Sequence, residues 1–183
     1  VKSCKNCSVR LCSLYFCARV EHLGFPGEGP LRVLTAKITA KNSLLKWNEA
    51  GWPHFELLCV QEHHLPYLDS CEKARAKVVA KGYQAYLTAA APTLAGVTRG
   101  GVGFLWPHHV RTLRPGKYIS NAWACAINIE HNTSGQTTVV NFYGHPTDIN
   151  TTLERLGGLV KKLSASGFSF NWGGFQCGCF YYG

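Results

Sequence analysis

The sequence predicts a layered α/β domain whose sheet is partly antiparallel. Segments with the apolar pattern of strands are interleaved with segments of helical periodicity. Two strand segments, 123–130 and 137–143, flank the turn-forming residues 131–135 and therefore predict an antiparallel hairpin. At 183 residues, the chain is long enough to bury one hydrophobic core.

Residues 1–30 are expected to form a cysteine-rich extension that ends in a Gly- and Pro-rich linker at 24–30. Zinc sites usually separate two ligand pairs by about a dozen residues or more, and the cysteines here are closer together. We therefore do not predict a zinc site among these cysteines. After the linker, a partial domain is expected to span residues 31–183. The crowded cysteines are Cys4, Cys7, Cys12 and Cys17.

The composition favours a soluble protein in a reducing, intracellular compartment. No apolar run approaches the roughly 18 residues of a membrane span. Cys59 and Cys125 lie within apolar strand patterns and are expected to be small buried side chains. Residues 1–20 are basic and contain serines but no acid, which weakly resembles a transit peptide and equally fits sequence outside the domain. Because the chain starts at Val1 and contains no methionine, we expect a fragment or an unusual reading frame.

The first elements of the domain alternate between strands and helices. Residues 31–40 are rich in Val, Ile and Thr and predict a strand. A short helix is expected at 43–50, before Gly51 and Pro53, and a more buried strand follows at 57–61.

A longer helix is predicted at 70–81, where Asp69 and Glu72 resemble a capping box and Gly82 provides the C-terminal stop. Its two acidic side chains would satisfy free amides at the start of the helix.

The next elements are a strand at 83–87, a loop at 89–97 and a strand at 101–106. The last of these strands is preceded by Gly100, and it opens with Gly101. Two adjacent glycines could bring the main chain close to a phosphate, although a bulge or tight turn is the more ordinary interpretation.

After the hairpin, a helix is predicted from Thr151 to Leu163 and a final strand at 168–172. The pair Gly157 and Gly158 weakens this helix. Its apolar face is expected to comprise Leu153, Leu156, Val160 and Leu163.

The charge is strongly positive, at +9, and it is unevenly distributed. From Lys73 through Ile129 there are eight basic residues and no acidic residue. Such a stretch would attract DNA or another polyanion, and the alternative is an ordinary solvated basic surface.

Five segments, in order, resemble the endonuclease/exonuclease/phosphatase superfamily and are most similar to the endonucleases of LINE-type retrotransposons. The resemblance implies a four-layer α/β sandwich that hydrolyses phosphodiester bonds with a divalent cation, usually Mg²⁺. The segments are 31–37, 58–62, 99–105, 141–146 and 173–176.

The same resemblance implies a set of site residues. Glu62 would hold the metal, because a hard cation prefers carboxylate oxygens. Tyr143 would order the scissile phosphate, Asn141 would support the same strand end, and Lys37 could contact a phosphate oxygen as a point charge. The alternatives are a strand-end salt bridge for Glu62 and simple packing for Tyr143.

Several positions depart from the family pattern. Lys37 stands where the family has an asparagine, and lysine cannot bind Mg²⁺. Gly174 and Gln176 replace the aspartate that positions water and the asparagine that contacts phosphate. The family's closing Ser, Asp and His segment has no counterpart, so we expect the domain to be incomplete at its C-terminus.

Histidines do not obviously replace the missing groups. His145 lies where the family often has proline or asparagine. His63 and His64 follow Glu62 directly, and adjacent side chains on an extended chain point to opposite faces. At most one of them could therefore join the site.

Together these features predict a degenerate relative of a Mg²⁺-dependent DNA endonuclease with little or no activity. The alternative is a non-catalytic structural or binding subunit of a larger assembly, with a protein partner covering an open sheet edge.

Overall fold

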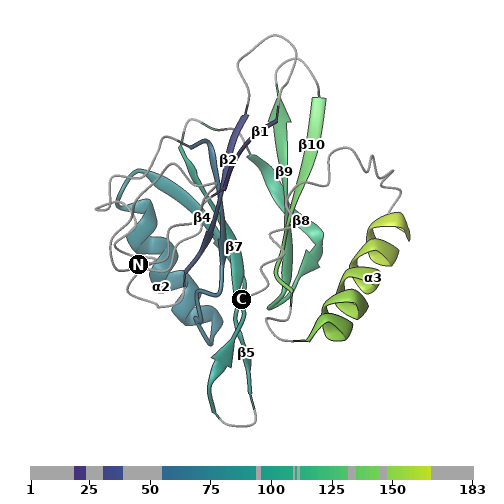
Figure 1. Ribbon diagram of the computed structural model, residues 1–183. Coiled ribbons are helices and arrows are strands. Elements are labelled where there is room, and N and C mark those ends of the chain that lie inside the picture. Colours follow the sequence, from purple (N-terminus) through teal and green to yellow (C-terminus); the bar gives the residue numbers. More distant parts are fainter. Residues whose placement is uncertain are drawn as a thin grey trace.

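The computed structural model in Figure 1 describes residues 19–23, 31–38, 55–93, 96–108, 110, 112–131, 135–144 and 148–165. These residues form a mixed α/β arrangement of sheets and helices, as the sequence predicts. The expected helix at 43–50, the expected strand at 168–172 and the four crowded cysteines lie outside the described residues.

The larger sheet has five strands, in the order β1-β2-β3-β7-β4. Strands β2 and β3 are parallel and the other neighbours are antiparallel. The strands predicted near 31, 57, 83 and 101 are confirmed, whereas β1 was not predicted and lies within residues 1–30. The bounds are β1 Arg19–Leu23, β2 Leu31–Lys37, β3 Leu57–Gln61, β4 Tyr83–Leu87 and β7 Val102–Pro107.

The smaller sheet has three strands, in the order β10-β9-β8. Strands β9 (Ala124–His131) and β10 (Gly135–Phe142) form the predicted antiparallel hairpin. Strand β8 (Thr112–Ser120) was not predicted, because it contains Pro115 and a glycine. Its pairing with β9 shifts register on both sides of a short regular stretch, which accommodates those residues.

A short two-stranded sheet occupies the region expected to be a loop at 89–97. It pairs β5 (Ala91–Pro92) with β6 (Thr98–Arg99) in an antiparallel manner. The loop prediction was therefore wrong at β5, and β6 directly follows the predicted loop; two-residue strands give too short a pattern to detect.

Helix α2 (Leu68–Val79) confirms the predicted helix, but the predicted capping box is wrong. The N-cap position is Tyr67, and no side chain caps the helix. Because the helix starts before Asp69, that carboxylate lies in the first turn, where it can favour the helix dipole but cannot cap. Glu72 instead accepts a hydrogen bond from Arg75 Nη1 at 3.0 Å.

Helix α3 (Ile149–Ala165) begins two residues earlier than predicted. Its start is capped by Asp148, whose Oδ1 accepts the N–H groups of Asn150 at 3.0 Å and Thr151 at 3.2 Å. The predicted apolar face is partly wrong, because Leu153 is 55% exposed. The face toward the smaller sheet includes Leu156, as predicted, and Leu159, which was not predicted.

Three apolar clusters fill the spaces between the layers visible in Figure 1, where α2 and α3 lie on opposite sides of the two sheets. The first joins α2 to one face of the larger sheet and includes Leu58 and Val78. The second lies between the two sheets and includes Phe104 and Ile127, together with Cys59 and Cys125, whose predicted burial is confirmed. The third joins the smaller sheet to α3. Within the described residues, no helix is long and apolar enough to cross a membrane.

Candidate functional site

Glu62 directly follows strand β3, at a sharp change in the direction of the chain. Its φ angle is 57° and that of His64 is 56°, both in the left-handed region that non-glycine residues rarely adopt. The segment is therefore not extended, contrary to the assumption made for the two histidines. Main-chain bonds from His63 and His64 to the carbonyls of Gly101 and Gly100, at 3.4 and 3.3 Å, hold the turn.

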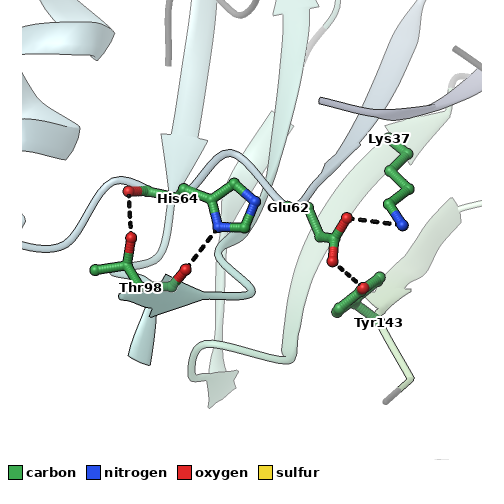
Figure 2. A network of polar contacts seen from close by, with 5 residues as sticks. All are labelled: Lys37, Glu62, His64, Thr98 and Tyr143. Atoms are coloured by element: carbon green, nitrogen blue, oxygen red, sulfur yellow. Dashed lines mark hydrogen bonds and ion pairs between the residues drawn. The ribbon is translucent and has the colours of Figure 1, made fainter. Parts of the chain in front are cut away.

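Neither of these two histidines contacts the Glu62 carboxylate. The His63 side chain is fully buried. The His64 ring instead bonds the Thr98 carbonyl through Nδ1 at 2.9 Å, and the Thr98 hydroxyl donates back to the His64 carbonyl at 3.1 Å (Figure 2). His64 thus fastens the turn to strand β6. His145 lies outside the described residues.

Both oxygens of the Glu62 carboxylate are engaged by neighbouring side chains, as Figure 2 shows. Lys37 Nζ, at the end of β2, lies 2.8 Å from Oε2. The Tyr143 hydroxyl, just after β10, donates to Oε1. Three strand ends therefore converge on one carboxylate, and the salt-bridge interpretation of Glu62 describes its actual contacts.

The Tyr143 hydroxyl remains a hydrogen-bond donor at neutral pH. Burial raises its pKa well above the usual range, and the bond to Glu62 and the charge of Glu62 raise it further. Arg155 and Arg99 act in the opposite direction, so both cationic side chains lie close enough to influence this hydroxyl.

Two aromatic rings and two cations form a continuous stack beside the carboxylate. The rings of Trp123 and Tyr143 are stacked with centroids 6.1 Å apart and planes inclined by 14°. Arg155 Cζ lies 3.5 Å from the centroid of Trp123, and Lys37 Nζ lies 5.9 Å from that of Tyr143. The stack therefore links α3 to β2 across the end of the smaller sheet.

Asn141 ties the two sheets together and does not face the carboxylate. It is buried, and its Nδ2 donates to the carbonyls of Val60 and Gly103, each at 2.9 Å. Its Oδ1 accepts a bond from Gln61 Nε2 at 3.1 Å, and the same nitrogen lies 3.0 Å from the Phe142 carbonyl. Asn141 is thus a positioning residue for the strand ends that carry Glu62 and Tyr143.

The two glycines before β7 allow close packing of protein against protein. Both have positive φ angles, 76° at Gly100 and 84° at Gly101. A Cβ atom at Gly101 would lie 2.5 Å from the His63 ring, and one at Gly100 would lie 2.6 Å from the Ala122 carbonyl oxygen. The close approach is therefore to other parts of the chain, which agrees with the tight-turn interpretation.

The donor set around Glu62 does not fit a divalent metal ion. Among the described residues, no group of three or more His, Cys, Asp or Glu side chains could hold one. Glu62 offers one carboxylate, and the Lys37 ammonium already lies against its Oε2. Mg²⁺ requires near-octahedral oxygen ligands, and an adjacent fixed positive charge opposes its binding. Gly174 and Gln176 lie outside the described residues.

The described basic side chains of the stretch from Lys73 to Ile129 do not lie on one surface. Lys73, Arg75 and Lys77 are exposed on α2, which covers the far face of the larger sheet. Arg99 is exposed on β6 and influences Tyr143. In the described part of the chain, the cations close to Glu62 or Tyr143 are Lys37, Arg99 and Arg155, two of which lie outside the stretch that the charge count indicated.

Three contributors to the site were not predicted. They are Gln61, which directly precedes Glu62, and Trp123 and Arg155, which tertiary packing brings close to Tyr143. Gln61 belongs to the segment 58–62 that carries the family resemblance, which is a usable signal. Trp123 and Arg155 belong to no motif, and only the docking of α3 places them together.

No protein family and no curated protein match this sequence. Among solved structures, the chain is similar to the endonuclease domain of TRAS1, a telomere-specific non-LTR retrotransposon, with 15% identity and a TM-score of 0.48. The similarity covers 76% of this chain and 54% of that one, so this chain spans about half the length of the solved domain.

Proposed function

We propose that this chain is a degenerate retrotransposon-type endonuclease domain that binds nucleic acid and does not hydrolyse it with Mg²⁺. The observation that carries the proposal is the state of Glu62, whose two oxygens contact an ammonium and a protonated phenol. The motif resemblance supports the ancestry. The order of α2, larger sheet, smaller sheet and α3 fits the four-layer sandwich that this ancestry implies.

Hydrolysis would need a group that activates water, and the side chains that contact Glu62 do not supply one. Lys37 is a cation, and the raised pKa of Tyr143 keeps its hydroxyl protonated. Gly174 stands where the family places its aspartate. General acid–base help is typically worth about 10²–10⁴-fold, and such groups act together, so these losses should nearly abolish turnover.

Binding of a polyanion requires only positively charged side chains near the surface, whereas catalysis requires a group that activates water. The cations near Glu62 outnumber its single carboxylate, and the Lys37 side chain is 41% exposed although it is paired. The chain carries a charge of +9. Contacts of lysine and arginine with phosphates release counterions, so the resulting affinity should fall steeply as salt rises.

The test combines a plasmid assay with a binding assay on the whole chain. Supercoiled plasmid should stay intact with or without Mg²⁺, and Glu62→Gln should behave like the parent. Fluorescence anisotropy with a labelled DNA duplex should show binding that weakens as NaCl rises. Nicking that requires Mg²⁺ and is lost in Glu62→Gln would refute the proposed loss of hydrolysis.

The second candidate is a non-catalytic subunit of a larger assembly. Within the described residues, β10 pairs with β9 alone, and this candidate places a partner strand on the other side of β10. This candidate predicts a stable protein complex whose affinity changes little with salt. Recovery of a well-folded monomer that binds DNA in a salt-dependent manner would favour the first candidate.

A further inference from the structure

We infer that Lys37 is a built-in cation that closes the Glu62 carboxylate to metal ions, so that removing its charge opens a cation site. The inference rests on the metal independence in the proposed function and does not depend on nucleic-acid binding. It assigns the loss of metal binding to a single side chain of this sequence.

The register of the larger sheet fixes Lys37 beside the carboxylate. Strands β2 and β3 are parallel, and Lys37 is the register partner of Gln61, the residue before Glu62. The ammonium lies 2.8 Å from Oε2 and 5.9 Å above the centre of the Tyr143 ring. Both contacts hold Lys37 in the place where a cation would otherwise approach Oε2.

The opposite oxygen is also closed to a metal ion. Oε1 accepts the Tyr143 hydroxyl, and the Glu62 side chain is only 13% exposed. A metal ion would have to displace the ammonium or the phenol. The ammonium is the stronger obstacle, because it repels a cation in addition to occupying its position.

Replacement of Lys37 by a residue with a neutral amide side chain should open the Glu62 carboxylate to a metal ion. In Lys37→Asn or Lys37→Gln, the repelling charge disappears and the new side-chain carbonyl oxygen becomes a further hard ligand. Lys37→Arg retains the positive charge and should keep the site closed. With a single carboxylate, the opened site should bind weakly, with a Kd on the order of 10⁻⁴–10⁻³ M.

Terbium luminescence provides a readout that is independent of activity. Tb³⁺ is a hard cation whose emission is sensitised by nearby aromatic rings, and Tyr143 and Trp123 lie beside Glu62. The parent and Lys37→Arg should show only background emission on titration. Lys37→Asn and Lys37→Gln should show saturable emission, with apparent affinity raised about tenfold or more, and excess Mg²⁺ should reduce that emission.

The matched controls locate the signal. Adding Glu62→Gln to either amide variant should return the emission to background. Lys77→Asn, which removes a charge on α2 of the parent, should leave the emission at the parental background. Circular dichroism verifies folding, and the two amide variants provide independent tests. Strong Glu62-dependent emission in the parent would overturn the inference, as would folded amide variants that stay at background. Failure of DNA binding would refute the proposed function alone.

Discussion

His63 shows how a single side chain can stabilise the turn that presents Glu62. Its ring is fully buried, and Nδ1 accepts the main-chain N–H of Leu65 at 3.2 Å. The ring proton therefore resides on Nε2, which has no hydrogen-bond partner in the described part of the chain. The ring packs where a Cβ at Gly101 would collide with it. Such a site favours the neutral imidazole.

The burial of His63 predicts a loss of stability in mild acid. Burial lowers its pKa from 6.5 to about 4, with His64 adding to the shift and main-chain groups such as Val102 opposing it. Because the unfolded chain takes up the proton first, this contribution is present above pH 6.5 and is lost as the pH falls toward 4. The full effect is about 3 kcal/mol in the free energy of unfolding.

Urea unfolding at pH 7, 5.5 and 4.5 measures this effect. In His63→Gln the decline between pH 7 and 4.5 should be smaller than in the parent, because the titrating group has been removed. His64→Gln provides the matched control and should retain the parental decline. Equal pH profiles for the parent and His63→Gln would contradict the assignment.

At the scale of residues, the sequence identifies which positions belong to the site better than it identifies which side chains contact each other. The motif pointed to Glu62, Lys37 and Tyr143, and the three side chains do meet. What a motif cannot express is that a departure, Lys37, can pair with a retained residue, Glu62. Lys37 was considered a phosphate contact, yet its ammonium pairs with the carboxylate because the parallel register places both at one strand end.

At the scale of elements, one buried amide joins strands from both sheets. Asn141 on β10 donates to carbonyls on β3 and β7, and it accepts from Gln61 at the end of β3. These bonds bridge residues about eighty positions apart in the chain for β3, so they depend on the assembled sheets. They fix the spacing between the strand ends that carry Glu62 and Tyr143.

Asn141→Ala should therefore destabilise the domain by about 2–3 kcal/mol, because it leaves buried polar groups without their partner. The comparison variant is Thr138→Ala on the same strand, whose hydroxyl bonds Asn128 Oδ1 at 2.9 Å within the hairpin. It should cost less than about 1 kcal/mol. Urea unfolding measures both, and equal losses would show that Asn141 does not link the sheets in the way described.

The elements themselves were predictable where their apolar pattern was long or continuous. Strand β3 is buried along its whole length and was located to the residue. Strand β8 was missed because a proline and a glycine interrupt the residue pattern typical of a strand. Strand β1 was missed because main-chain pairing with β2 does not require a distinctive sequence. The inward face of α3 was partly misassigned, since docking against the smaller sheet turns Leu153 toward solvent.

At the scale of the whole molecule, layering separates two basic regions. Helix α2 carries exposed Lys73 and Lys77 on one side of the larger sheet. The group formed by Lys37, Arg99 and Arg155 lies at the strand ends near Tyr143. The charge count along the sequence combined residues of both regions, because it contains no information on the sheet that lies between them.

This separation predicts which region binds nucleic acid. If phosphates contact the strand ends near Tyr143, Arg99→Ala should weaken DNA binding and reduce the slope of log affinity against log salt by about 1. Lys77→Ala on α2 should leave that slope unchanged, although it removes the same formal charge. Anisotropy titrations between about 50 and 200 mM NaCl measure both slopes. Because a net-charge effect would alter the two variants alike, equal slopes in Arg99→Ala and Lys77→Ala would exclude a specific contact at Arg99. A change confined to Lys77→Ala would instead move the interface to α2 and leave the Glu62 site without a role in binding.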